Sequence, residues 1–121
     1  MSIAVWIGVA CLGGCGALAR FLLDGAIGSR LGGEFPWGTF AINVSGSFVL
    51  GLLVGAAVAG NALVLAGTAT IGSYTTFSTW MLETHRLGED DDRLLLVANV
   101  VGSLVTGVAA AYLGRQIGRT L

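Results

Sequence analysis

The chain has 121 residues, of which 55% are hydrophobic and only 11% are charged. A water-soluble domain of this length carries more charge, so the composition predicts an integral membrane protein. The formal net charge is −1 and all six basic residues are arginines, which leaves no basic face for nucleic acid. The sequence has no cluster of metal-binding side chains, no nucleophile triad and no phosphate-binding loop, so we do not expect an enzyme.

Four apolar segments are each long enough to cross a membrane as a helix, which takes roughly 20 residues. They lie at about residues 3–23, 38–58, 62–82 and 94–113. We therefore expect an all-α integral membrane fold with one four-helix transmembrane domain over residues 1–121. The first segment has no positively charged start, so we interpret it as a retained span of a multi-pass protein of the cell membrane.

The connectors carry only a weak charge asymmetry. An even number of spans puts both termini on one side, with Arg115 and Arg119, and the longer connectors, residues 24–37 and 84–93, on the other. Two basic residues against four give a weak orientation signal under the positive-inside rule. The chain is therefore compatible with both orientations, and with an antiparallel pair of copies.

Glycines recur at the spacing of helix contacts. The chain has 20 glycines, and Gly51 and Gly55 form a GxxxG pair in the second segment. Such spacing lets helix backbones approach closely. Cys11 and Cys15, four residues apart in the first segment, fit the same interpretation as small packing residues. Because a single four-helix chain has little interior, this density favours an oligomer.

A hydroxyl-rich stretch interrupts the third apolar segment. Five Ser and Thr side chains lie between Ser73 and Trp80, together with the phenol of Tyr74. These side chains suit a lipid-facing helix poorly, so polar groups here must meet protein, an ion or a water-filled cavity. A helix broken near the membrane midplane is one way to build an ion site from backbone carbonyls. We expect such a break in the third helix.

Two polar stripes accompany this stretch. Thr39, Asn43 and Ser47 follow at i, i+4 and i+8 in the second segment, and Asn99, Ser103 and Thr106 at i, i+4 and i+7 in the fourth. Side chains at these offsets share a helix face. Hydrogen bonding between helices explains any one of these residues equally well. Taken together, the stripes predict the lining of a narrow polar track.

The side chains near this track suit a small, strongly hydrogen-bonding anion. Asn, Ser and Thr offer N–H and O–H donors. Phe77 and Trp80 share a face of a regular helix, and the edges of their rings carry the positive part of the aromatic quadrupole. Ordinary packing is the alternative for both rings. Arg20 and Glu83 lie near the membrane boundary, as site residues or as side chains that reach the interface.

Three motifs lie in order along the chain: residues 13–20 (GGCGALAR), residues 38–48 (GTFAINVSGSF) and residues 75–80 (TTFSTW), followed by Glu83. Together they resemble the Fluc/CrcB family of fluoride channels. The resemblance covers the whole chain in length, number of spans and order of motifs. It implies four transmembrane helices per subunit and an antiparallel, dual-topology homodimer. It also implies a fluoride-selective channel that passively exports fluoride from the cytoplasm and so relieves fluoride toxicity.

The resemblance also assigns roles to individual residues. A structural sodium ion (Na+) at the dimer centre would be held by the backbone carbonyls of Gly72 and Thr75 from both subunits. The fluoride pathway would include Asn43, Phe77, Trp80 and Ser103, and with the hydroxyl groups noted above we expect Thr39, Thr106, Thr76 and Thr79 to line it too. Arg20 and Glu83 match charged positions near the vestibules. The expected partners are fluoride, membrane lipid, and a second copy of the chain or a sister subunit.

The sequence departs from the family pattern at two positions. Trp80 replaces the usual Phe, and its indole N–H offers an additional donor. Gly107 stands where many members carry a further hydroxyl.

Two other functions remain to be weighed. A small multidrug-type proton-coupled exporter needs a carboxylate within the first span, which has none before Asp24. A non-transporting membrane assembly subunit needs only the glycine packing, so the buried hydroxyl groups argue against it.

Overall fold

The computed structural model describes residues 1–121 and is entirely helical. The first two helices are α1 (Ile3–Leu31) and α2 (Trp37–Gly55). A third helix continues without interruption through α3 (Gly60–Leu63), the π-helical η1 (Val64–Ile71) and α4 (Gly72–Tyr74). After a gap comes α5 (Ser78–Glu89), and the last helix runs through α6 (Arg93–Val97), the π-helical η2 (Ala98–Gly102) and α7 (Ser103–Gly118).

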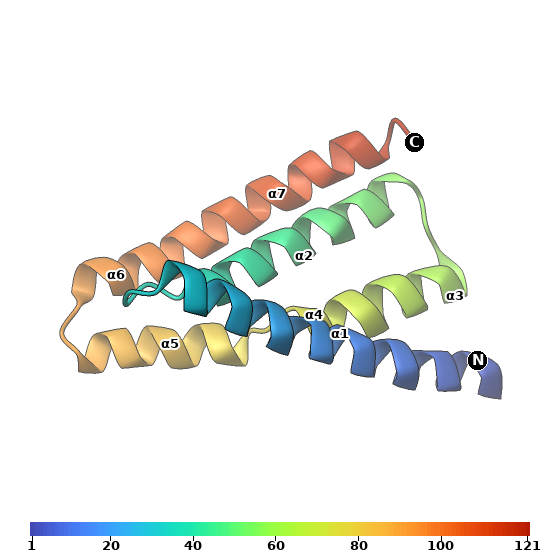
Figure 1. Ribbon diagram of the computed structural model, residues 1–121. Helices are drawn as coiled ribbons and strands as arrows, with labels where there is room; N and C mark the ends of the chain where they lie inside the picture. Colours follow the sequence, from blue (N-terminus) through green and yellow to red (C-terminus); the bar gives the residue numbers. More distant parts are fainter.

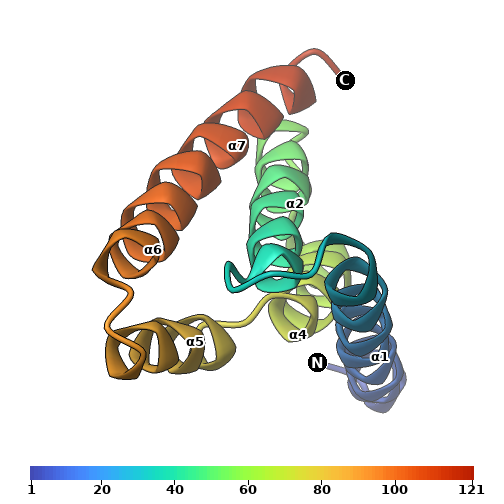
Figure 2. The same ribbon diagram turned by 60° about the vertical axis from the view of Figure 1, so that its left-hand side comes forward.

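Three of these helices are long and apolar enough to cross a membrane: Ile3–Leu31, Trp37–Gly55 and Arg93–Gly118. The prediction of an all-α membrane protein therefore agrees with the structure. The third predicted segment is divided at residues 75–77, where Thr75 adopts an extended conformation with ψ 161°. In Figure 1 the two chain termini lie at the same end of the bundle, and Figure 2 shows that α5 follows α4 across the break and runs in a clearly different direction.

The helix ends differ from the predicted segment boundaries. The first helix runs to Leu31, so the connector predicted at residues 24–37 shrinks to residues 32–36. Gly32 and Gly33 stop the helix there, with φ of 59° and 79°, which favour glycine. The second helix ends at Gly55, and the turn predicted at residues 59–61 lies at residues 56–59. Hydropathy locates the apolar part of a helix, whereas caps and left-handed residues decide where it ends.

Glycines bring the C-terminal parts of α2 and α7 into close contact, and the two helices separate toward α6 (Figure 2). A Cβ atom on Gly51 would meet the carbonyl oxygen of Ala111, and one on Gly55 would meet that of Arg115. The contact is reciprocal, because a Cβ atom on Gly114 or Gly118 would meet the backbone of α2. The prediction that the GxxxG pair of the second helix packs tightly is confirmed.

A second close approach joins α1 to the third helix, on the other side of α2 (Figure 2). A Cβ atom on Gly16 would overlap the hydroxyl of Ser73 and the carbonyl of Thr70. Most of the remaining helix surface is uncovered, because only 14 of the 121 residues are buried. Three of the buried residues are hydrophobic, and four are polar: Thr39, Thr76, Asn99 and Ser103. The remaining seven buried residues are glycines. The small interior of the subunit is thus made mostly of glycines and polar side chains, and its outer faces need lipid or another subunit to cover them.

Candidate functional site

The break between α4 and α5 leaves backbone groups without partners. The carbonyl oxygens of Gly72 and Thr75 accept no hydrogen bond, and the N–H of Phe77 donates none. Free carbonyls at a helix C-terminus carry partial negative charge, and free N–H groups at an N-terminus carry partial positive charge. The break therefore brings a cation-attracting helix end and an anion-attracting helix end close together.

Asn43 on α2 holds this break in place. Its Nδ2 donates to the carbonyl oxygen of Thr76 at 2.8 Å, and the N–H of Thr76 donates to its Oδ1 at 2.8 Å. This pair of bonds uses one of the two amide N–H groups and leaves the other free to donate. Ser47, one turn further along α2, donates its hydroxyl to the carbonyl oxygen of Asn43 at 2.7 Å. Ser47 therefore has no free hydrogen to offer a ligand in this arrangement.

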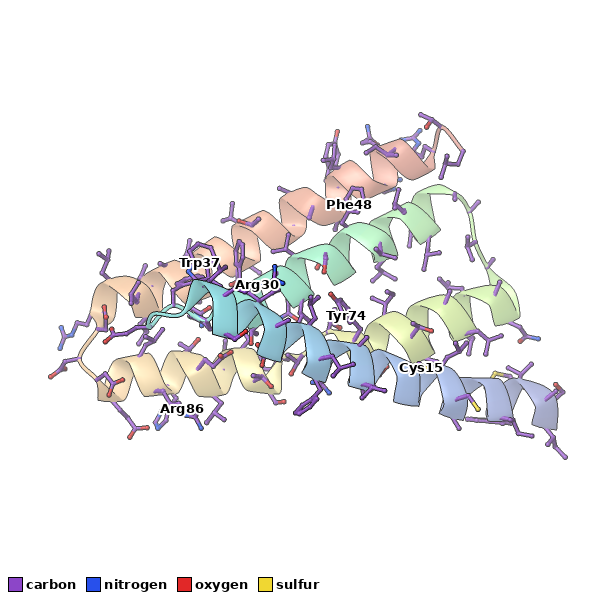
Figure 3. The ribbon with its side chains drawn as sticks, viewed as in Figure 1. Cys15, Arg30, Trp37, Phe48, Tyr74 and Arg86 are labelled. Carbon is purple, nitrogen blue, oxygen red and sulfur yellow. The ribbon has the colours of Figure 1, made fainter.

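A second contact fixes the other side of the break. The hydroxyl groups of Ser45 and Tyr74 lie 2.9 Å apart, and Ser45 donates its only hydroxyl hydrogen to the carbonyl oxygen of Ile42 at 3.1 Å. Tyr74 is therefore the donor to Ser45, and Figure 3 shows its side chain between α4 and α2. Gly46 lies between these contacts, where a Cβ atom would meet the methyl group of Thr75. The last residue of α4 and the first two residues of the break are thus held by α2.

Two predicted pathway residues, Thr76 and Thr79, are bonded to each other at the start of α5. The hydroxyl of Thr76 accepts from the N–H of Thr79 at 3.3 Å and donates to the hydroxyl of Thr79 at 3.1 Å. The Thr76 hydroxyl, one residue before the N-cap position at Phe77, thus gives a partner to one N–H group of the first turn of α5. Thr76 is only 8% exposed, and its hydroxyl hydrogen is committed to Thr79. The hydroxyl of Thr79, which accepts that bond, retains its own hydrogen for another acceptor.

The two aromatic residues meet edge to face. The ring centroids of Phe77 and Trp80 lie 5.7 Å apart with an interplanar angle of 86°. The indole N–H of Trp80 donates to the backbone carbonyl of Asn99 at 3.0 Å. It is therefore not available as the additional pathway donor that the sequence suggested.

A groove of about 700 Å³ gathers most of the predicted site residues. It is lined from α2, the third helix, α5 and α7, and its lining includes the predicted residues Asn43, Gly72, Thr75, Thr76, Phe77, Trp80 and Ser103. The hydroxyl of Ser103 is buried and has no partner. Thr39, Thr79 and Thr106 do not line this groove. On the last helix Gly107 lines it instead, so Thr106 does not replace the hydroxyl that Gly107 lacks.

The two predicted vestibule charges do not meet. Glu83 lines a separate hollow of about 340 Å³ with Asp24, Glu34 and Arg86, whereas Arg20 lines neither hollow and forms no ion pair. In the loop beside this hollow, a hydrogen bond with Asp92 and the negative charge of that residue raise the pKa of the Glu34 carboxyl. Most of the charged side chains that line this hollow are carboxylates.

One residue of the polar stripes is more closely involved in the site than the sequence predicted. Asn99 was placed on a polar stripe but not among the site residues, yet it is completely buried and bonded to both Trp80 and Thr84. An Asn in a long apolar run was the available signal. Its partner could not be read from the sequence, because Thr84 lies beyond the predicted end of the third span.

The chain is similar to known proteins over almost its whole length. A family model described as CrcB-like protein, Camphor Resistance (CrcB), matches residues 7–115. The Fluoride-specific ion channel FluC 2 of Mycolicibacterium paratuberculosis is 52% identical over 116 residues, which cover 96% of this chain and 95% of that protein. The Fluoride-specific ion channel FluC 1 of Frankia casuarinae is 42% identical, over 96% of this chain and 97% of that protein. The protein of the same name from Symbiobacterium thermophilum is 40% identical, over 93% of this chain and 96% of that protein.

These relatives are named as channels, and the prediction that the chain is not an enzyme is confirmed by its family. With its long apolar helices, the chain is a multi-pass membrane protein. The match over nearly the whole length shows that the chain belongs to the CrcB family.

Proposed function

We propose that the chain forms a fluoride-selective channel in the cell membrane and lets fluoride leave the cytoplasm down its electrochemical gradient, which relieves fluoride toxicity. The observation that carries the proposal is the break at residues 75–77, which Asn43 holds at the wall of a mainly apolar groove that the unpartnered hydroxyl of Ser103 also lines. The names of the relatives, all fluoride-specific ion channels, support fluoride as the ion.

The working unit in this proposal is an antiparallel homodimer of four-span subunits. The third span would be the broken helix, from Gly60 through α5, with its break near the membrane midplane. A single subunit leaves its groove open on one side and its outer helix faces uncovered, which is consistent with a second copy on one face and lipid on the others. The weak charge asymmetry of the connectors permits both orientations of the chain.

The donors available to fluoride are fewer than the polar residues of the groove. Asn43 has one free amide N–H, and the hydroxyl of Ser103 has no partner. The ring edges of Phe77 and Trp80 add weak positive charge, whereas the free hydroxyl hydrogen of Thr79 lies outside the lining of the groove. Fluoride is small and accepts strong hydrogen bonds, so a few such donors in a narrow space replace its water better than they replace that of chloride.

A structural sodium ion fits the chemistry of the break. The carbonyl oxygens of Gly72 and Thr75 accept no hydrogen bond and belong to a helix C-terminus, where partial negative charge favours a cation. Two subunits would supply four such oxygens. A cation there would stabilise the crossing of the two broken helices and offset the cost of an anion in a medium of low dielectric constant.

Ion efflux from liposomes tests the proposed function. We expect purified protein to release fluoride rapidly and chloride not at all, and we expect Phe77→Ile to abolish fluoride release by removing the ring. Phe21→Ile is the matched control, because Phe21 is 74% exposed on α1 and lines neither hollow. Equal release of the two anions would overturn the selectivity, and release that requires a proton gradient would support an exporter instead. No release of either anion from folded protein would overturn the channel.

A further inference from the structure

A closed set of hydrogen bonds joins α5 to η2. The indole N–H of Trp80 donates to the carbonyl oxygen of Asn99 at 3.0 Å. In the opposite direction, Nδ2 of Asn99 donates to the hydroxyl of Thr84 at 2.9 Å, and that hydroxyl donates to the carbonyl oxygen of Trp80 at 2.8 Å. The three residues therefore tie the second half of the broken helix to the last helix at two points.

The burial of Asn99 argues that this arrangement serves more than stability. Its side chain is 0% exposed, and its Oδ1 atom has no donor. A buried acceptor without a partner is unfavourable, and an apolar side chain of the same size would avoid that cost. What the amide supplies at this position is a donor to Thr84, and through Thr84 a fixed position of α5 relative to η2.

We propose that Asn99 and Thr84 are positioning residues that hold the Trp80 ring in its orientation beside Phe77. This proposal rests on the proposed function, because it assigns the Trp80 ring to the wall of the ion pathway. A tryptophan side chain turns about two bonds, and a hydrogen bond at its far end removes that freedom. The fixed orientation sets the edge-to-face contact of Phe77 and Trp80 at 86°. A phenylalanine at this position has no ring donor, so the device is specific to a chain that carries tryptophan there.

A spectroscopic test follows that does not depend on ion flux. Trp6 and Trp37, the other two tryptophans, are partly exposed and can be replaced by phenylalanine, which leaves Trp80 as the only indole. In that background we expect Thr84→Val to lower the fluorescence anisotropy of Trp80 and Thr84→Ser, which keeps the hydroxyl, to preserve it. Thr120→Val is the matched control, because Thr120 is exposed near the C-terminus and its hydroxyl bonds only to Ile117. Unchanged anisotropy in Thr84→Val would overturn the proposal.

A double-mutant cycle then connects the position of the ring to transport. We expect Thr84→Val to reduce fluoride efflux several-fold in the wild-type background and by a clearly smaller factor in the Trp80→Phe background, which lacks the indole N–H. An equal reduction in both backgrounds would mean that Thr84 acts only on helix packing, and would overturn the proposal. If the wild-type protein does not conduct fluoride, the proposed function fails, whereas the anisotropy result still decides whether Asn99 and Thr84 fix the ring.

Discussion

The substitution Asn43→Ala tests the contact on which the candidate site depends. It removes two hydrogen bonds of 2.8 Å that pair the N–H and the carbonyl of Thr76. Two such bonds contribute about 1–3 kcal/mol net, and two buried backbone groups left unpaired would cost about 2–6 kcal/mol. Because Thr76 is only 8% exposed, water replaces the lost partners poorly. We therefore expect a loss of stability between about 1 and 6 kcal/mol, concentrated at residues 75–77.

Two measurements together locate this effect. Amide hydrogen exchange of the peptide containing Thr76 should accelerate, and fluoride efflux should fall. Asn43→Asp should give a smaller loss of protection, because at neutral pH a carboxylate still accepts from the Thr76 N–H but cannot donate to its carbonyl. Asn61→Ala, at an exposed position near the start of α3, is the control and should change neither measurement. Unchanged exchange at Thr76 in Asn43→Ala would refute the role of Asn43 in holding the break.

Two further predictions concern the helix contacts and the cation. Gly51→Ala should prevent normal folding, because its Cβ atom would meet the backbone carbonyl of Ala111. Gly107→Ala should fold normally, because the nearest atom to its Cβ lies 3.7 Å away. Circular dichroism and gel filtration in detergent would compare the two variants, and normal folding of both would contradict the close contact of α2 and α7. Replacing sodium by a large organic cation should lower the melting temperature, because the free carbonyls of Gly72 and Thr75 would lose the cation that we propose for them. A melting temperature independent of sodium would argue against that site.

Several features followed from the sequence because they depend on local composition. The apolar segments predicted a membrane protein, and three of them form long apolar helices. The hydroxyl groups between Ser73 and Trp80 predicted a break, and the helix is interrupted at residues 75–77. The pair Gly51 and Gly55 predicted close packing, which α7 provides. In each case a few neighbouring residues carry the physical cause, either the cost of polar groups in lipid or the absence of a side chain.

The tertiary structure alone decided which polar groups are free to act. The sequence treated Ser47, Thr76 and the Trp80 indole as available donors, but their hydrogens are committed to Asn43, Thr79 and Asn99. Asn43 meets a partner 33 residues away, and Trp80 meets one 19 residues away. A hydroxyl or amide has the same donors in any sequence, so its function depends on which neighbours the fold brings within hydrogen-bonding distance. Residue type thus determined what chemistry the chain can offer, and packing determined which of those groups remain for an ion.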